Sequence, residues 1–311
     1  MIYIFSPEGK NFVFWNWMQC IGKDTPDFLQ RLSTIHIPHL TIGTGKEGFF
    51  LTPNAKIKIF FTLWRFSQTE FGFEFDGGYN NERKTFLNEW IEHYTFGEEI
   101  MLQSISSSWV WIFDTSPLPF PWILPMHTLS IQEKLRAFHH SSHAFGQPWV
   151  TLWGPKKEIE KWIHSFFPAF SLLSEEELEK WRIQALYPRV SYEFHKEATP
   201  FELGLDHVIA SHKGCYPGQE VIEKMRSFNA APRILVQIQS EGAIAPHPGE
   251  KIFNYLHPEH KIGKITSCIS IAKSQFLMLG LIRKQYSQEN LKVQFQNPPI
   301  QGTIKKIIYP N

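Results

Sequence analysis

The sequence predicts an α+β body of about two domains followed by a C-terminal β-barrel. The chain has 311 residues, which is too many for one ordinary hydrophobic core. Aromatic residues make up 15% of it, and such large side chains suit strands and thick cores. From Arg233 onward, short strand-like runs alternate with turn residues, which is the pattern of a small all-β module.

The body combines predicted helices with predicted strands. At residues 24–32, Asp24 can cap a helix whose first turn holds Pro26. At residues 174–184, Ser174 can cap a helix with glutamates in its first turn, where carboxylates suit the helix dipole. The other helices predicted in the body are residues 83–94, 131–139 and 156–166. The strands predicted there are residues 49–52, 56–66, 71–75, 109–113 and 149–153, and the proline-rich residues 117–125 are expected to form a linker.

The C-terminal region has a different residue pattern from the body. Its strand-like runs are short, and Gly, Pro, Asn and charged residues separate them at near-regular spacing. The predicted strands are residues 234–238, 251–253, 261–267, 276–282 and 291–295. Spacing of this kind is typical of a small barrel or sandwich.

The charge balance bears on the class of partner. Lys and Arg total 31 and Asp and Glu total 30, so the formal net charge is +1. A protein that holds long duplex nucleic acid usually shows a clear basic surplus. We therefore expect no direct nucleic-acid partner.

Cysteine usage and hydropathy bear on the compartment. The three cysteines, Cys20, Cys215 and Cys268, are odd in number, widely separated and without a Cys-x-x-Cys pair, which favours a reducing compartment. The N-terminus lacks the basic and apolar regions of a secretion signal. The most apolar segment, residues 109–126, is interrupted by Asp114 and four prolines, so we expect no membrane span. These features predict a cytoplasmic protein.

The strongest local signal surrounds Cys215. Two glycines flank it within five residues, Pro217-Gly218 fits a type II turn, and residues 219–228 are predicted to be helical. This pattern places the sulfur on an exposed turn that leads into a helix N-terminus, where the helix dipole and nearby Lys213 would favour the thiolate. Thiolate is the form that attacks, exchanges with disulfides or binds soft metals. The alternative is that Cys215 is a small buried residue and that the glycines only make a turn.

The same segment resembles a known family. Residues 213–220 read Lys-Gly-Cys-Tyr-x-Gly-Gln-Glu, which matches without a mismatch the signature of YgfZ-type folate-binding proteins. The likeness extends to residues 22–30, 51–56, 181–188, 200–203, 263–267 and 279–283. It implies a three-domain ring of the aminomethyltransferase type, shared with the enzyme of glycine cleavage. The implied domains are a discontinuous folate-binding α+β domain of residues 1–52 and 140–232, a central ferredoxin-like domain of residues 53–139, and a C-terminal β-barrel of residues 233–311.

The resemblance also implies a function. Members of the family hold tetrahydrofolate in a central cavity and serve the assembly or repair of iron–sulfur clusters, with indirect effects on tRNA modification. The implied partners are the folate molecule and iron–sulfur enzymes or assembly proteins. The resemblance carries the family's working cysteine to Cys215, beside Lys213. The residues expected around the folate are Tyr216, Gln219, Glu220, Gln184, Arg233 and His36.

Two of these residues depart from the family pattern. His36 stands where the family usually has an acidic residue or Asn, and Gln184 stands where a glutamate is usual. A glutamate accepts from both adjacent N–H donors of a pterin, whereas Gln184 accepts only with its oxygen. Two other functions therefore stay open. One is a folate-dependent one-carbon transferase, and the other is a non-enzymatic binding module that has lost the ligand.

A histidine cluster is the main metal candidate in the sequence. His139, His140 and His143 could present two imidazoles on one helical face, but a metal site also needs further ligands and a second shell. No acidic residue lies between Lys134 and Lys156. A polar loop is the better interpretation, and we expect no metal site.

Overall fold

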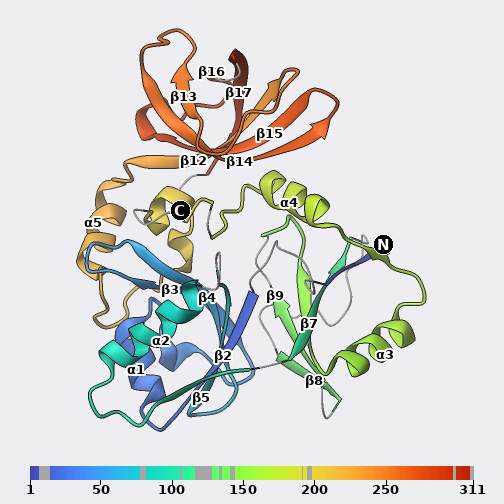
Figure 1. The fold of residues 1–311 in the computed structure, drawn as a ribbon. Helices are drawn as coiled ribbons and strands as arrows, with labels where there is room; N and C mark the ends of the chain where they lie inside the picture. The colour runs from blue at the N-terminus through green and yellow to red at the C-terminus, as the bar shows by residue number, and fades with distance from the viewer. Residues whose placement is uncertain are drawn as a thin grey trace.

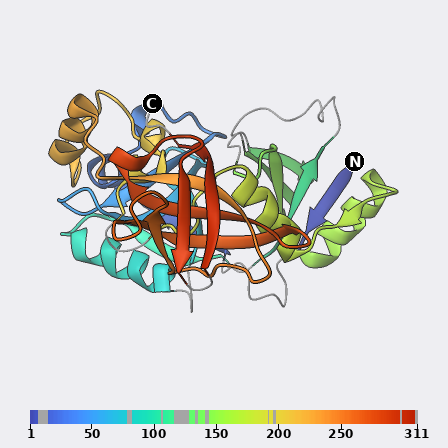
Figure 2. The ribbon, with the colours of Figure 1, turned by 90° about the horizontal axis from the view of Figure 1, so that it is seen from above.

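A computed structural model describes residues 1–6, 15–77, 82–105, 107–115, 128–132, 135–140, 144–190, 192–194, 198–296 and 299–308. In Figure 1 they form two open-sheet lobes below a barrel. Figure 2 shows from above that the barrel lies over the middle of the molecule, between the two sheet lobes. The predicted α+β body with a C-terminal barrel is confirmed.

The first sheet is antiparallel, with strand order β3-β4-β5-β2-β6. Its strands are β2 (Trp15–Ile21), β3 (Gly45–Leu51), β4 (Ile57–Arg65), β5 (Glu70–Asp76) and β6 (Met101–Ser104). Helices α1 (Thr25–Leu32) and α2 (Glu82–Tyr94) supply Phe28 and Leu87 to one core with Phe61 and Phe73 of the sheet. Because strand side chains alternate between faces, Thr62 and Glu74 lie on the opposite face.

The second sheet has strand order β11-β1-β7-β10-β9-β8. Its strands are β1 (Ile2–Phe5), β7 (Ser108–Asp114), β8 (Thr128–Gln132), β9 (Leu135–His140), β10 (Trp149–Gly154) and β11 (Ser171–Leu172). Helix α3 (Lys156–Phe166) packs Ile159 and Trp162 against one face. The other face packs Trp111 and Trp149 in one aromatic cluster with Trp64 of the first sheet. The two sheets therefore share a core.

The barrel is closed in the order β12-β15-β14-β13-β16-β17. Its strands are β12 (Arg233–Glu241), β13 (Lys251–Asn254), β14 (Lys261–Ala272), β15 (Gln275–Arg283), β16 (Lys292–Gln296) and β17 (Pro299–Ile307). The helices that join the lobes to the barrel are α4 (Glu175–Gln184) and α5 (Gln219–Phe228), with the short 3₁₀ helices η1 (Ile37–His39), η3 (Pro200–Leu203), η4 (Asp206–Val208) and η5 (Lys284–Tyr286) elsewhere. The barrel core is continuous with Phe49, Tyr216 and Ile222, so the segment around Cys215 packs where the first sheet meets the barrel.

One element prediction is wrong. Residues 131–139 were expected to be helical, but residues 135–140 form strand β9, which pairs with β10 on one side and β8 on the other. Pairing between two strands outweighs a short helical pattern. The expected linker at residues 117–125 lies outside the described residues.

The domain boundaries that the resemblance implied stay predictions, and each can be located among the observed strands. The boundary at residue 52 falls in the hairpin between β3 and β4, where Phe49 pairs with Phe60. The boundary at residue 139 falls at the end of β9, inside the second sheet. Strand β12 begins at Arg233, where the barrel domain was expected to begin.

None of the helices within these described ranges is both long and apolar enough to cross a lipid bilayer.

Candidate functional site

The segment around Cys215 is a loop that ends in helix α5. Gly218 is the N-cap of that helix and has a φ of 86°. A Cβ at Gly218 would lie 2.6 Å from the carbonyl oxygen of Thr52, so only glycine fits both the conformation and the space. The Cys215 side chain is exposed. The structure therefore presents the thiol to solvent on a turn before a helix, as the sequence predicted.

Lys213 holds this loop against the end of α1. Its side chain is only 5% exposed, and Nζ donates to the carbonyl oxygens of Gln30 (2.8 Å), Ile35 (2.9 Å) and Ser33. Burial lowers the pKa of Lys213 to about 8. Nζ also lies 5.2 Å from the centre of the Tyr216 ring. These contacts tie the loop to residues almost 180 positions earlier in the chain.

The neighbours of Cys215 differ in how they are placed. Tyr216 is buried, and its hydroxyl has no hydrogen-bond partner among the residues described here. Burial raises the pKa of Tyr216 to about 12. Gln219 is half-buried, whereas Glu220 is exposed and pairs with Lys224 at 2.6 Å. A pair this exposed contributes little to stability.

His36 lies beside the same loop anchor. It follows Ile35, whose carbonyl oxygen accepts from Lys213, and its ring stacks on His39 with the centres 3.9 Å apart. Loss of hydration and the neighbouring His39 lower the pKa of His36. His36 and the signature loop are thus brought together, although they are far apart in sequence.

Gln184 and Arg233 lie elsewhere. The Gln184 side chain is exposed at the end of α4, and its backbone oxygen accepts from Gln237 Nε2 (3.3 Å). Arg233 begins β12, and its Nε donates to Oε1 of the buried Glu202 (2.6 Å). The eight residues predicted for the site therefore do not form one cluster.

A recess lies between the two sheets. It measures about 680 Å³ with its open mouth included, of which about 60 Å³ is available to the centres of water molecules. Its walls are largely aromatic. The side chains that line it include Phe60, Trp111, Phe145, Trp149, Glu47, Thr62, Glu74, Asp76, His140, Arg182, Tyr187 and Arg189. None of the eight predicted residues is among its lining residues.

A buried polar group links the two sheets at this recess. Glu74 of β5 is 1% exposed, and it accepts from Trp64 Nε1 (2.8 Å) and from Thr151 Oγ1 (3.1 Å) of β10. His140 Nε2 lies 2.8 Å from Thr151 Oγ1. Because Thr151 donates its single hydrogen to Glu74, His140 is the donor in that contact.

His140 is neutral in this arrangement. Burial lowers the pKa of His140 to about 3, and the neighbouring His139 acts in the same direction. The carboxylate of Glu74, 3.4 Å from Nε2, acts in the opposite direction, but burial outweighs it. The His140 ring is stacked on Trp149, with centres 4.4 Å apart. The recess thus offers a carboxyl group that accepts two hydrogen bonds beside a neutral imidazole.

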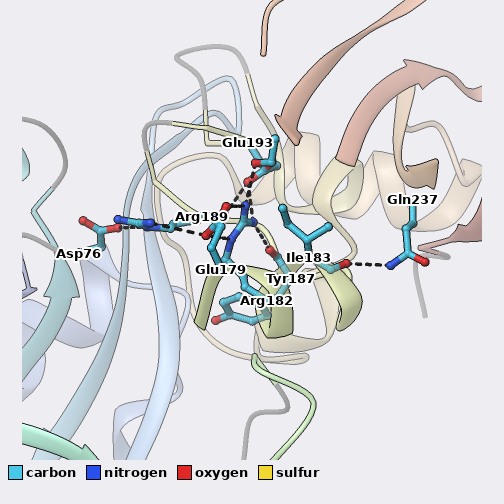
Figure 3. Close-up of polar contacts among 9 residues, drawn as sticks. Asp76, Glu179, Arg182, Ile183, Tyr187, Arg189, Glu193 and Gln237 are labelled. Carbon is cyan, nitrogen blue, oxygen red and sulfur yellow. Dashed lines mark hydrogen bonds and ion pairs between the residues drawn. The ribbon is translucent and has the colours of Figure 1, made fainter. Parts of the chain in front are cut away.

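A second polar network forms another wall of the recess (Figure 3). Arg182 of α4 is 1% exposed, and its five N–H groups donate to Glu179 (2.5 and 2.9 Å), Glu193 (3.0 Å), Tyr187 O (2.6 Å) and Ser267 Oγ (2.7 Å). Burial acts to lower the pKa of Arg182, but the charges of Glu193 and Glu179 raise it.

The network extends to the barrel and to the first sheet. Ser267 belongs to barrel strand β14 and also donates to Glu193 (2.7 Å). Arg189 Nε donates to Asp76 of the first sheet (3.3 Å), as Figure 3 shows. Helix α4 is therefore joined by buried charges to the barrel and to the first sheet.

Sequence reasoning did not find the recess, although one signal was present. Glu74 and Asp76 alternate with Phe71, Phe73 and Phe75 in β5. Two carboxylates on one face of an otherwise aromatic strand indicate a polar site, because buried carboxylates need partners. The histidines at 139 and 140 belong to strand β9, and His143 lies outside the described residues.

The described residues hold one group with three potential metal ligands. His257 and His260 lie 3.6 Å and 3.4 Å from Glu259, on the turn between β13 and β14. All three side chains are exposed. Nothing buried orients them, and exposed pairs of this kind are common at protein surfaces.

Comparison with known protein structures identifies the fold of this chain. No protein-family model matches the sequence, and no curated protein matches it either. The structure is similar to the crystal structure of glycine cleavage system aminomethyltransferase T from Bartonella henselae. The TM-score is 0.82 and the sequence identity 14%, over 98% of this chain and 85% of that chain. The chain therefore has the fold of the aminomethyltransferase type with a C-terminal β-barrel, as the sequence predicted.

Proposed function

We propose that this protein is a tetrahydrofolate-binding accessory factor for the assembly or repair of iron–sulfur clusters, acting in the cytoplasm and affecting tRNA modification indirectly. The observation that carries the proposal is the exposed thiol of Cys215 in an intact Lys-Gly-Cys-Tyr-x-Gly-Gln-Glu signature, on a loop that Lys213 anchors from beneath. In this proposal Cys215 is the working side chain and Lys213 positions its loop.

The other two cysteines support the choice of Cys215. Cys20 is buried, and burial raises its pKa to about 12. Cys268 is half-buried, and burial together with the charge of Glu250 raises its pKa to about 11. Thiolate is the reactive and metal-binding form, and high pKa values suppress it. Of the three cysteines, Cys215 is the one whose side chain is exposed.

The recess between the sheets fits the pterin ring of tetrahydrofolate. Its aromatic walls, which include Trp111 and Trp149, suit a flat ring. A pterin presents adjacent N–H donors, and the carboxylates of Glu74 and Asp76 can accept them. Trp149 Nε1 is buried without a hydrogen-bond partner in the described part of the chain, so it can donate to a ligand. Tetrahydrofolate, when bound, supplies a nitrogen that carries one-carbon units.

This assignment moves the proposed ring contacts from Gln184 to Glu74 and Asp76. Gln184 is exposed and outside the recess. The family resemblance pointed to Gln184 because a carboxylate is usual at that position. Here the carboxylates come from strand β5 instead.

The function can be tested in cells that lack this protein. The Cys215→Ala variant should leave iron–sulfur enzymes as inactive as the deletion does, because the thiol is lost while the loop anchor remains. Cys268→Ala is the matched control and should restore their activity. If Cys215→Ala restores the enzymes as well as the native protein does, the proposed role of the thiol is wrong.

One alternative has an observation in its favour. A folate-dependent one-carbon transferase needs an acid or base near the folate nitrogen, and Glu74 and Asp76 lie in the recess. Turnover with an aminomethyl donor and tetrahydrofolate would select this alternative. Absence of turnover with intact folate binding would leave the accessory role.

A further inference from the structure

A second recess lies on the barrel and is strongly basic. It measures about 520 Å³ with its open mouth included, of which about 200 Å³ is available to the centres of water molecules, and it is formed where β12, β14 and β15 run side by side. Its charged lining residues are Arg233, Lys261, Lys264 and Arg283. None of these residues lines the recess between the two sheets. The two recesses are therefore separate sites.

Strand register brings like charges face to face here. Arg233 of β12 is directly opposite Arg283 of β15, and Lys251 of β13 is directly opposite Lys264 of β14. Lys264 is also paired with Leu281, two residues from Arg283 on the same face. A band of cations thus crosses four neighbouring strands. Like charges directly opposite each other destabilise an antiparallel sheet.

Few carboxylates offset this charge. Glu202 accepts from Arg233 at 2.6 Å. Lys261, Lys264 and Arg283 are exposed, and they form no ion pair with any carboxylate in the described ranges. The whole chain has a net charge of only +1, so the surplus is local. An anion in the recess would relieve the repulsion among these cations.

Gly263 shapes the strands beneath the recess. It lies between the charged residues of β14, and a Cβ there would be 2.3 Å from the carbonyl oxygen of Leu281. Glycine therefore lets β14 and β15 approach closely at this point.

We propose that this recess binds a small ligand with two or more anionic groups, either phosphate or carboxylate. Two arginines and two lysines around one space match such a ligand, because guanidinium and ammonium groups form charge-assisted hydrogen bonds with both kinds of oxygen. The balanced charge of the chain favours a small ligand over nucleic acid.

The test uses the full chain without folate and two probes, pyrophosphate and citrate, followed by isothermal titration calorimetry. The native protein should bind at least one probe saturably, and the affinity should fall as salt is added. The Lys264→Ala and Arg283→Ala double variant should bind about tenfold more weakly or worse. Tighter binding of pyrophosphate would identify a phosphate ligand, and tighter binding of citrate a carboxylate ligand.

The control removes the same charge elsewhere on the barrel. Lys292 and Lys305 are exposed on β16 and β17 and do not line the recess. Their double alanine variant should keep the native affinity within about twofold. Lys261→Ala, at the edge of the recess, gives a second variant if the first pair unfolds.

Three results would overturn the proposal. The first is that native protein binds neither probe, and the second is that the recess and control variants lose equal affinity. The third is displacement of the probe by single-stranded DNA with an affinity that grows with strand length, because that result identifies a nucleic-acid surface.

Discussion

Lys213 shows how one side chain can place the signature cysteine. Its ammonium group donates to three carbonyl oxygens at and just after the end of α1. The last carbonyl groups of a helix have no partner within the helix, so such a donor stabilises this end. The sequence suggested that Lys213 would favour a thiolate at Cys215. The contacts show instead that its ammonium is engaged beneath the loop. Lys213 therefore affects Cys215 by fixing the position of the loop that carries it.

The charge of Lys213 should make stability depend on pH. Burial lowers the pKa from the ordinary 10.5 to about 8, so between these values the unfolded chain binds more protons than the folded one. The free energy of unfolding of the native protein should therefore rise with pH from about 8 to 10.5, relative to that of Lys213→Met. The gain should be up to about 3 kcal/mol.

Urea unfolding of both proteins at several pH values measures this difference. Contributions from groups that the two proteins share, such as Tyr216, cancel in the comparison. A difference that falls over the same pH range would show that the three carbonyl contacts favour the charged amine more than burial disfavours it.

At the scale of elements, the capping of α4 illustrates what the sequence reveals. Glu177 N donates to Ser174 Oγ (3.1 Å) and Ser174 N donates to Glu177 Oε2 (3.0 Å), as the local pattern predicted. Asp24 does not cap α1 with its side chain, which instead accepts from Glu99 N (2.8 Å). The cap at Ser174 needs only neighbouring residues, whereas the partner of Asp24 is 75 positions away. Sequence patterns show the first kind of contact and miss the second.

Gly218, in the loop before α5, has a matched control in Gly249, which lies between β12 and β13. Gly218 and Gly249 both have positive φ, at 86° and 93°, so alanine meets similar backbone strain at each. A Cβ at Gly218 would also collide with Thr52 O, whereas a Cβ at Gly249 would have nothing within 4 Å. Gly249→Ala should cost about 1 kcal/mol and Gly218→Ala at least about 2 kcal/mol, because the collision adds to the strain.

Thermal unfolding of the two variants gives this comparison. Accessibility of Cys215 to a thiol reagent should change in Gly218→Ala and not in Gly249→Ala. Equal costs at the two glycines would show that the close approach to Thr52 does not hold the loop.

At the scale of the whole molecule, buried charges join the three bodies. Arg182 connects α4 with the barrel through Ser267 and with the segment that holds Glu193, which is fully buried. Removing one partner of a buried ion pair leaves an uncompensated charge. Arg182→Met should therefore lower the free energy of unfolding by about 3–5 kcal/mol.

Arg226→Met is the control for this prediction. Arg226 pairs with Glu223 at 2.8 Å, but Glu223 is exposed and Arg226 only half-buried, so the loss should be less than about 1 kcal/mol. Urea denaturation measures both. If the two variants lose the same stability, the buried network is not what joins α4 to its neighbours.

Only part of the candidate site could be predicted from the sequence. The turn at Gly218 and the exposure of Cys215 follow from adjacent residues, so a local pattern indicated them. The recess depends on Glu74, Thr151 and Arg182, which come from different bodies and meet only when the sheets pack. Gln184 was expected beside the ligand from the family resemblance, and that role stays a prediction; its side chain is exposed at the end of α4. Contacts between residues far apart in the sequence determine where the recess side chains lie, and local patterns do not show such contacts.

Titration of tetrahydrofolate against the purified protein tests the central claim most directly. With intrinsic Trp fluorescence as the signal, native protein should show saturable quenching, because Trp111 and Trp149 line the recess. Glu74→Gln should weaken binding about tenfold, because an amide accepts with only one of its two polar atoms, and Gln184→Ala should not. No quenching at high micromolar tetrahydrofolate, or loss of binding in Gln184→Ala but not in Glu74→Gln, would contradict the account.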